Sequence, residues 1–377
     1  MPFTTRITLL ALAVTLLTGG CQTLAPKTTP ELIQTPVFTA GTEGYHTFRI
    51  PALIATQQGT LLAFCEGRKN SRSDHGDLDL VLKRSTDGGS TWGPLQLVYE
   101  EGGDADITIG NPCPVVDQNT GIIWLPFCRN NDRVFITKSQ DDGLTWACPV
   151  EITADVKPKG WGWYATGPGV GIQLRRGPHK GRLVIPCDHR EPFGGQEVMA
   201  SHVFYSDDAG ATWHIGGSVS PHTDECQVVE LADGRLMMNM RNYWARTAQQ
   251  PANGGMRAAA WSTDGGEWWS PLRFEHALPE PVCQASFLRY SRDPNRLIFS
   301  NPGHPGKRIK MTIRMSLDEG ETWPIARVLH QGPSAYSCLT ALPNGPIACL
   351  YECGKKGSYE TITFARFPLA WLTGASP

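Results

Sequence analysis

The sequence predicts an all-β fold, a six-bladed β-propeller of four-stranded antiparallel blades. Three observations in the 377-residue chain support it: an eight-residue pattern that occurs five times, six pairs of short apolar runs, and turns rich in Gly, Asn and Asp between the runs. A unit of four strands repeated along one chain is typical of a propeller, in which each unit forms one blade. The length would also suit two average domains, but the repeats favour a single closed body.

Each predicted blade begins with two apolar runs joined by a turn, which we interpret as its strands A and B. The first runs are 51–56, 113–118, 169–174, 226–231, 285–290 and 336–342. The second runs are 60–66, 122–128, 182–188, 235–241, 296–301 and 346–352. Six pairs predict six blades.

The eight-residue pattern is Ser-x-Asp-x-Gly-x-Thr-Trp. It occurs at 85–92, 139–146, 206–213 and 316–323, and a fifth copy at 262–269 has Trp268 in place of Thr. Its Asp and Gly have the turn chemistry of a hairpin, so we place it in the turn between strands C and D, with its Trp packed between neighbouring blades. A device that occurs five times is structural rather than catalytic.

The amino terminus has the features of an export signal. Residues 7–17 are apolar, follow Arg6 and are fewer than the ~20 residues that a membrane span needs, so residues 1–20 are predicted to be a signal peptide. Residues 17–21, Leu-Thr-Gly-Gly-Cys, resemble the lipobox of bacterial lipoproteins, which implies lipid attachment at Cys21. Residues 21–35 would then be a tether and 36–377 the propeller. The protein is expected in the cell envelope as a lipoprotein, or as a secreted or periplasmic protein if Cys21 is not lipidated.

The segment around 35–40 is expected to close the ring, because the last predicted blade has no eight-residue pattern after it and lacks an outer strand. An N-terminal strand that completes the last blade would leave no open edge in the ring.

Composition excludes several classes of partner and site. The chain has 34 Lys+Arg against 36 Asp+Glu and a formal charge of −2, which argues against a nucleic-acid partner. Most of the ten cysteines after Cys21 fall in the apolar runs, so we interpret them as buried thiols rather than disulfides. Their spacing does not resemble a zinc site, and we predict no metal and no cofactor.

Reactive side chains collect at one rim of the predicted ring. In an antiparallel meander the start of strand A, the end of B and the B–C loop share one rim, and the C–D turns lie at the other. The first rim carries Arg49, Arg68, Asp74, Glu225, Arg241, Arg308 and Tyr336. Several arginines without as many acids would leave unpaired positive charge, so we predict an anionic ligand, and a guanidinium fork suits a carboxylate in particular.

The run Phe48-Arg49-Ile50-Pro51 together with the five eight-residue patterns, known as Asp boxes, resembles the exo-α-sialidase (neuraminidase) family of bacterial and animal enzymes. The likeness runs from about residue 35 to the C terminus and includes 66–68, 73–74, 111–114, 163–168, 225–231, 239–242 and 335–337. It implies a glycoside hydrolase that releases terminal α-linked sialic acid from glycoproteins, glycolipids and oligosaccharides, and hence a role in ganglioside and oligosaccharide catabolism.

The resemblance assigns three catalytic residues and seven that bind the substrate. The catalytic residues are Tyr336 as nucleophile, Glu225 as its partner and Asp74 as general acid/base. The binding residues are Arg49, Arg241 and Arg308, which would grip the sialic acid carboxylate, and Arg68, Asp106, Trp163 and Tyr164, which would line the sugar pocket.

The chemistry of this set is coherent. Sialic acid has a carboxylate on its anomeric carbon, so a carboxylate nucleophile would be repelled whereas a neutral phenol is not. A phenol with a pKa of ~10 needs a base for its proton, which Glu225 would supply. Asp74 would protonate the departing oxygen and then deprotonate the water that releases the sugar, with net retention.

Other interpretations of these residues remain open from the sequence. Asp74 could cap a turn, Asp77 and Asp79 compete for its role, Glu230 is a rival of Glu225, and Tyr336 could be a packed aromatic side chain. Two other functions fit the same rim: a sialic-acid-binding propeller that does not hydrolyse, and an enzyme that transfers sialic acid or forms an anhydro product.

Overall fold

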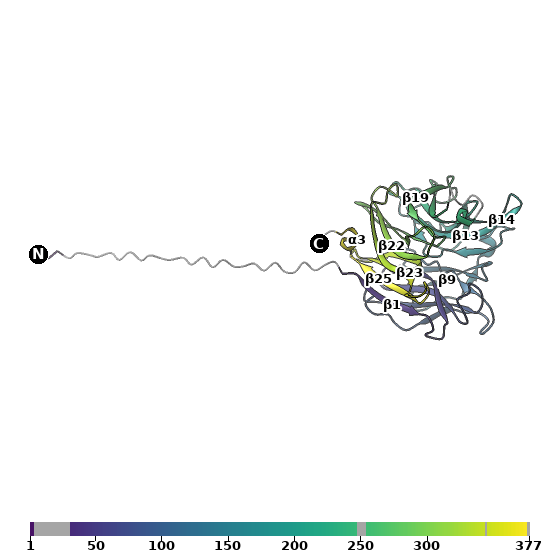
Figure 1. Cartoon of the computed structure of the whole chain (residues 1–377), viewed down its shortest axis with the longest axis horizontal. Coiled ribbons are helices and arrows are strands. Elements are labelled where there is room, and N and C mark those ends of the chain that lie inside the picture. The colour runs from purple at the N-terminus through teal and green to yellow at the C-terminus, as the bar shows by residue number, and fades with distance from the viewer. Residues whose placement is uncertain (4–30, 247–253, 344, 375–377) are drawn as a thin grey trace.

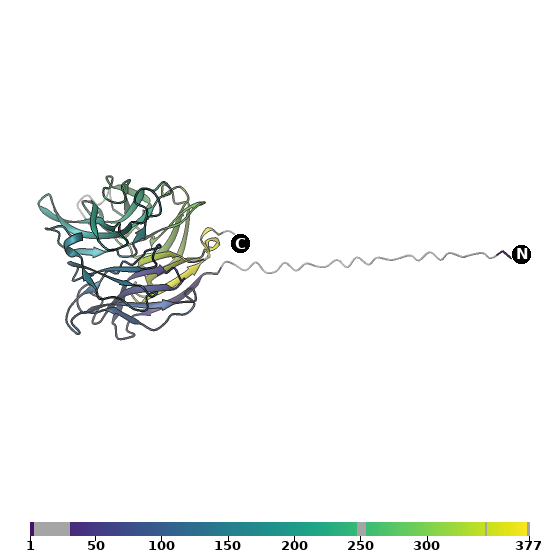
Figure 2. The same cartoon turned by 180° about the vertical axis from the view of Figure 1, so that it is seen from behind.

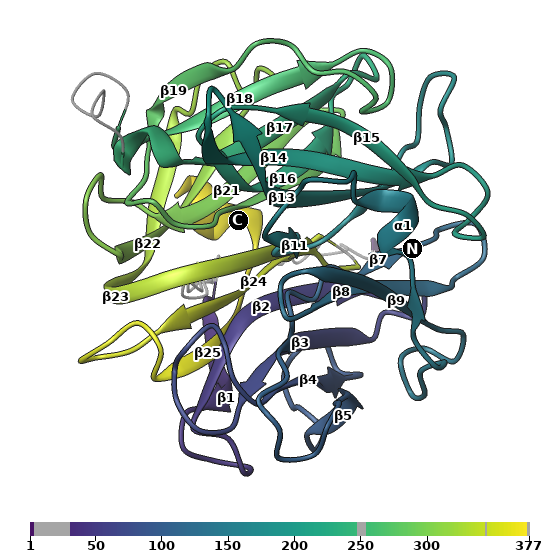
Figure 3. The same ribbon diagram turned by 90° about the vertical axis from the view of Figure 1, so that its right-hand side faces the viewer.

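The computed structural model describes residues 1–3, 31–246, 254–343 and 345–374, so most of the predicted export signal, Cys21 and most of the tether lie outside the described residues. The described chain is almost entirely β-structure, and its small sheets are arranged around an axis like the blades of a propeller (Figure 3). Figures 1 and 2 show that β1 (Ile33–Thr39) and the C-terminal helix α3 (Leu369–Thr373) lie on the same side of the body.

Four of the sheets have the size of one blade. Two contain four strands each, β2 (Thr47–Ala55), β3 (Leu61–Arg68), β4 (Leu78–Ser85) and β5 (Gln96–Tyr99), and β16 (Thr223–Glu230), β17 (Leu236–Asn242), β18 (Met256–Ser262) and β19 (Arg273–Pro279). Two contain five, because their first strand is divided: β6 (Ile109–Gly110), β7 (Val115–Val116), β8 (Ile123–Arg129), β9 (Arg133–Ser139) and β10 (Val150–Glu151), and β11 (Tyr164–Thr166), β12 (Ile172–Gln173), β13 (Leu183–Phe193), β14 (Gln196–Ser206) and β15 (His214–Val219). In the chain, the short helix α1 (Thr153–Val156) comes between two of these sheets, and η1 (Tyr243–Arg246) comes between β17 and β18 of one sheet.

The remaining sheet corrects the prediction of six separate four-stranded blades. It has seven strands in the order β1, β25 (Thr361–Phe367), β24 (Ile347–Cys353), β23 (Ile325–Ala341), β22 (Ile309–Ser316), β21 (Asn295–Pro302) and β20 (Ser286–Arg292). The sheet is continuous because β23 is 17 residues long: it pairs with β22 up to Pro333 and with β24 from Ser334 onward. No loop separates the two pairings.

The predicted closure by the N-terminal segment is confirmed. β1 pairs antiparallel with β25, with Thr35 opposite Phe364 and Thr39 opposite Thr361, and so forms the outer edge of the seven-stranded sheet. The N-terminal strand β1 therefore holds the last strand, β25, in place.

The Asp boxes are confirmed as repeated hairpin turns that join neighbouring sheets. In the first box the Ser85 hydroxyl donates to Asp87 Oδ1 at 2.8 Å, and Asp87 accepts the backbone N–H of Thr91 at 2.9 Å. The other four boxes repeat these bonds, with the Trp268 N–H in place of that of Thr in the fourth. The Trp92 ring meets Phe364 of β25 edge-on at 5.3 Å, which packs one sheet against the next.

The core lies between the sheets. One apolar cluster joins Leu62 and Phe64 of β3 to Leu125 and Phe127 of β8. The ten described cysteines are all free and all but Cys148 are buried, which confirms their interpretation as buried thiols. No helix in the described ranges is long and apolar enough to cross a membrane.

Candidate active site

A cavity of about 570 Å³ opens at the rim that the sequence predicted to carry the chemistry. It is lined by eight of the ten predicted site residues: Arg49, Arg68, Asp74, Trp163, Glu225, Arg241, Arg308 and Tyr336. The residues of the five Asp boxes are not among its lining, as expected for turns at the opposite rim. Its size is in the range of small-molecule sites.

Three similar β-bulges place side chains at this cavity. Between Arg49 and Ala52, β2 has one more residue than the strand it pairs with, β3. The same extra residue occurs in β16 at 223–226 and in β23 at 334–337. A bulge adds one residue to one strand and re-aims the side chains beside it. Pro51, which has no N–H for a ladder bond, lies in the first bulge. Arg49, Glu225 and Tyr336 are thus delivered by one backbone device used three times.

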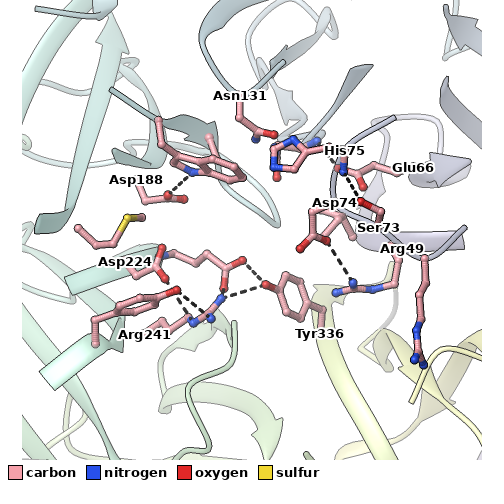
Figure 4. Close-up of a pocket in the computed structure, with 18 of the residues that line it drawn as sticks. Arg49, Glu66, Ser73, Asp74, His75, Asn131, Asp188, Asp224, Arg241 and Tyr336 are labelled. Carbon is pink, nitrogen blue, oxygen red and sulfur yellow. Dashed lines mark hydrogen bonds and ion pairs between the residues drawn. The ribbon is translucent and has the colours of Figure 1, made fainter. Parts of the chain in front are cut away.

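Tyr336 lies against Glu225 and Arg241 (Figure 4). Its hydroxyl donates to Glu225 Oε1, and Arg241 Nη1 donates to the Tyr336 oxygen at 3.1 Å and to Glu225 Oε2 at 2.6 Å. Burial and the neighbouring Glu225 raise the pKa of Tyr336, against the opposite effect of the arginines, so the phenol is neutral. A neutral phenol beside a carboxylate that already accepts its hydrogen bond is arranged for proton transfer to that carboxylate.

Arg49 is held from behind by Glu352, a residue that the sequence analysis missed. Glu352 Oε1 accepts Arg49 Nε at 2.7 Å and the backbone N–H of Ile50 at 3.0 Å, and Oε2 accepts the N–H of Tyr336 at 3.0 Å. The Glu352 side chain is fully buried. One carboxylate therefore fixes both an arginine and the backbone of the tyrosine.

Asp74 projects into the cavity from the loop between β3 and β4 (Figure 4). Its Oδ1 accepts Arg68 Nη1 at 2.8 Å and lies 3.5 Å from Arg49 Nη1, and its side chain is 65% exposed. Partial burial raises the pKa of Asp74, but the charges of Arg68 and Arg49 lower it by more. The pKa of Asp74 is therefore below its usual value. The carboxylate is ionised and accessible from the cavity. Arg68 itself is held by Glu66 Oε2 at 2.6 Å.

Arg308 comes from the loop before β22, as predicted. Its Nη1 donates to the Tyr359 hydroxyl at 3.0 Å and its Nη2 donates to the carbonyl of Val282 at 2.9 Å. Among the described residues it has no carboxylate within ion-pair distance. Its charge is thus offset only by neutral dipoles and is open to an anion.

Seven arginine and five carboxylate side chains line the cavity, so the arginines outnumber the acids as predicted, but three of the predicted arginines do have a carboxylate partner. Arg49 is paired with Glu352, Arg68 with Glu66, and Arg241 with Glu225. The sequence argument did not count Glu66 and Glu352, although both end second runs and therefore belong to the same rim. Of the four arginines that it placed there, Arg308 alone has no carboxylate partner among the described residues.

Two further carboxylates, Asp188 and Asp224, line the cavity and were also missed. Asp188 Oδ2 accepts the indole N–H of Trp163 at 3.1 Å, and Asp224 Oδ2 lies 3.4 Å from Arg241 Nε. Burial, then the charges of Asp224 and Glu225, raise the pKa of Asp188 well above its usual value. Burial raises the pKa of Asp224 to about 6, with Arg241 acting against it. One signal could have found Asp188, since it ends a second apolar run as Arg241 and Glu352 do.

Asp106 and Tyr164 do not line the cavity, which corrects their predicted place in the sugar pocket. Asp106 is exposed in the loop before β6, and the residues of that blade that reach the cavity are Asn111 and Asn131. Tyr164 is fully buried because successive side chains of β11 point to opposite faces. Its hydroxyl lies 2.9 Å from His202 Nε2 in the core.

The rival acids lie elsewhere. Asp79 accepts the hydroxyl of Tyr45 and pairs with Lys69 at 3.0 Å, and Asp77 is buried nearby; neither lines the cavity. Glu230 accepts the N–H of Arg175 at 3.0 Å and lines a separate cavity of about 480 Å³. Within the described residues, no group of three or more His, Cys, Asp or Glu side chains is arranged to hold a metal ion.

Residues 59–349 match the model of the BNR repeat-like domain. The chain is 38% identical over 361 residues to a sialidase of Micromonospora viridifaciens, an alignment that covers 89% of this chain and 53% of that protein. It is 32% identical to human sialidase-3, covering 88% of this chain and 91% of that protein. Among solved structures, Hadza microbial sialidase Hz136 superposes with a TM-score of 0.80 at 31% identity, over 90% of this chain and 69% of that one. The chain spans about half the length of the Micromonospora relative.

Proposed function

Because the chain belongs to the sialidase family, we propose that it is a retaining exo-α-sialidase that hydrolyses terminal α-ketosidically linked sialic acid. The observation that carries this is the contact of Tyr336 with Glu225 and Arg241 inside a cavity that also holds Arg308. Sialylated glycoproteins, glycolipids and oligosaccharides are the substrate class.

In the proposed mechanism the substrate carboxylate lies against Arg308, Arg241 and the Nη groups of Arg49. Glu225 takes the proton of Tyr336 as the phenol oxygen attacks the anomeric carbon. The arginines offset the charge of the carboxylate next to an oxocarbenium-like transition state. All of these groups are held by hydrogen bonds before substrate arrives, so little reorganisation is needed.

Asp74 acts as the acid for the departing oxygen and then as the base for water. Its carboxylate is ionised in the free protein because Arg68 and Arg49 are close. A substrate carboxylate that engages Arg49 weakens one of these interactions and so raises the pKa of Asp74. Substrate binding thus favours the protonated form that the first step needs.

The test is release of the fluorophore from a fluorogenic α-sialoside by the wild type, Tyr336→Phe and Asp74→Ala. Tyr290→Phe is the matched control, since its hydroxyl donates to the carbonyl of Gly345 away from this cavity. We expect full activity in the wild type and the control, loss of activity in Tyr336→Phe, and a smaller loss in Asp74→Ala because the aryl leaving group needs little acid catalysis. The first product by NMR should be the α-anomer. A wild type that binds free sialic acid but releases no fluorophore would favour the non-hydrolytic binding function. An anhydro sugar, or a new sialoside when lactose is added, would favour the transfer enzyme.

We also infer that the seven-stranded sheet serves as two blades that share β23, which would make six. This is supported by the change of partner between Pro333 and Ser334. An experimental structure in which the seven strands form one evenly twisted sheet would exclude it.

We further propose export and lipid attachment at Cys21, on the sequence pattern of residues 7–21 alone. The mass of the N-terminal peptide from protein expressed in a bacterial host tests this. A diacylglyceryl-modified Cys21 supports the proposal, and an unmodified peptide that begins elsewhere contradicts it.

A further inference from the structure

A fully buried ion pair lies beside the cavity but does not line it. Arg257 on β18 donates from Nη1 to Glu280 Oε2 at 3.2 Å, and both side chains have no exposed surface. Arg257 Nε also donates to Asn239 Oδ1 at 2.7 Å. Replacing such a pair by apolar side chains often costs no stability, so its presence calls for a role in geometry.

Glu280 ties this pair to the backbone next to Arg241. Its Oε1 accepts the N–H of Asn242 at 2.9 Å, the residue that directly follows Arg241 on β17. The position of the Arg241 backbone therefore depends on the Glu280 carboxylate.

The same pair clamps the segment that follows Glu280. The N–H of Cys283 donates to Glu280 Oε2 at 3.0 Å, and the Cys283 carbonyl accepts Arg257 Nη1 at 2.6 Å. Both polar groups of one residue are thus bound by the two members of the ion pair. Residues 280–283 are closed into a tight loop.

This loop presents the carbonyl that orients Arg308. Val282 has a φ of +55°, a conformation that is costly for a β-branched residue and persists only where its surroundings enforce it. The Val282 carbonyl accepts Arg308 Nη2 at 2.9 Å. Since Arg308 has no carboxylate partner among the described residues, this carbonyl and the Tyr359 hydroxyl set its orientation.

We propose that Arg257 and Glu280 are positioning residues that set Arg241 and Arg308 together, at the spacing that one substrate carboxylate requires. The inference rests on the proposed function. Neither residue touches the substrate; each acts through the backbone of Asn242 or of the 280–283 loop. One ion pair thereby couples two arginines that come from different sheets.

The experiment uses Arg257→Lys and the double variant Arg257→Gln/Glu280→Gln. The first keeps the charge but not the fork that reaches Asn239, Glu280 and Cys283 at once. The second variant removes both charges of the pair, so neither residue is left as an unpaired buried charge. It therefore keeps the proposal testable if Arg257→Lys does not fold. Arg182→Lys is the control, because the Arg182 side chain is also buried and binds two carboxylates, Asp207 and Glu267, away from the cavity; these two partners are about half exposed.

The readout is the ratio of the dissociation constants of sialic acid methyl ester and of sialic acid, measured by calorimetry. We expect both test variants to lower this preference for the acid about tenfold, equivalent to about 1.4 kcal/mol, while the control keeps it. Folded variants that lose thermal stability but keep the wild-type ratio would show a merely structural pair and overturn the inference. A wild type that neither binds sialic acid nor cleaves a sialoside overturns the proposed function, and this inference with it.

Discussion

Replacing Glu352 by Gln should impair both the stability of the fold and the use of substrate. The Glu352 carboxylate accepts three hydrogen bonds, from Arg49 Nε, the Ile50 N–H and the Tyr336 N–H. Losing a charged hydrogen bond costs about 1.5–3 kcal/mol, and a Gln NH₂ facing a buried N–H leaves a donor unsatisfied at about 1–3 kcal/mol. The sum of about 2.5–6 kcal/mol includes the range of about 3–5 kcal/mol for breaking one side of a buried ion pair. Ile50 has a φ of +61°, a strained conformation for a β-branched residue. The Glu352 carboxylate helps to hold this conformation, so its replacement should favour relaxation of the backbone there.

The assay has two parts: the free energy of unfolding from urea titration, and kcat/KM for a fluorogenic sialoside. Glu230→Gln is the matched control, because that buried carboxylate also accepts backbone N–H groups, of Arg175 and Arg176, and pairs with Arg292. Both variants should lose similar stability, but only Glu352→Gln should lower kcat/KM, by about 10–100-fold, since Arg49 and Tyr336 are no longer fixed. A loss below about 1 kcal/mol, or an equal kinetic effect in both variants, would refute the reasoning.

Three other outcomes follow from the structure. Asp74→Ala should slow cleavage of sialyllactose by about 10²–10⁴-fold but that of 4-nitrophenyl sialoside far less, because only a poor leaving group needs the acid; equal losses in rate assays would contradict this. Hydrogen bonds from Thr91 lower the pKa of Asp87 to about 2, so the stability that this box contributes should be complete above the unfolded pKa near 4 and be lost as the pH falls toward 2. Urea midpoints at pH 5 and pH 3 should therefore differ less in Asp87→Asn than in the wild type. Cys148 should be the only described cysteine that reacts with a thiol reagent before unfolding, and rapid labelling of a second one by mass spectrometry would be inconsistent with the packing.

The repeats predicted the strands and the closure of the fold but not the way its last sheets join. Boxes and paired runs mark strand ends because turns have strict side-chain chemistry. Whether two neighbouring four-stranded units stay separate depends on a loop between them, and residues 325–341 contain only Gly332 and Pro333 as breaks. Those residues lie where β23 changes its partner, and the strand continues through them.

The sequence predicted those site residues whose role depends only on their position at the rim. It missed residues whose role depends on the direction of a side chain or on a buried partner. Asp74 and Arg308 lie in loops at the expected rim, and Glu225 lies near the start of β16. Tyr336 lies within β23, two residues after Ser334, where this strand begins to pair with β24. Tyr164 was misplaced because the direction of a side chain depends on strand register, which one residue reverses. Asp188 and Glu352 end second runs as Arg241 does, so the same rule applied to all six runs would have found them.

The way the arginines are held explains how a cavity lined by five carboxylate side chains can still attract an anion. Glu352 takes the Nε edge of Arg49, and the Val282 carbonyl with the Tyr359 hydroxyl takes part of Arg308. These partners fix the orientation of each guanidinium from behind, while remaining N–H groups face the cavity. The strongly raised pKa of Asp188 favours its neutral form, so this carboxyl group adds less negative charge to the cavity than an ordinary aspartate would. The electrostatic field within the cavity therefore depends on how the guanidinium groups are oriented and on which carboxyl groups are protonated, and not only on the number of charged residues. For this reason the positions of the buried partners decide whether the site can bind a carboxylate.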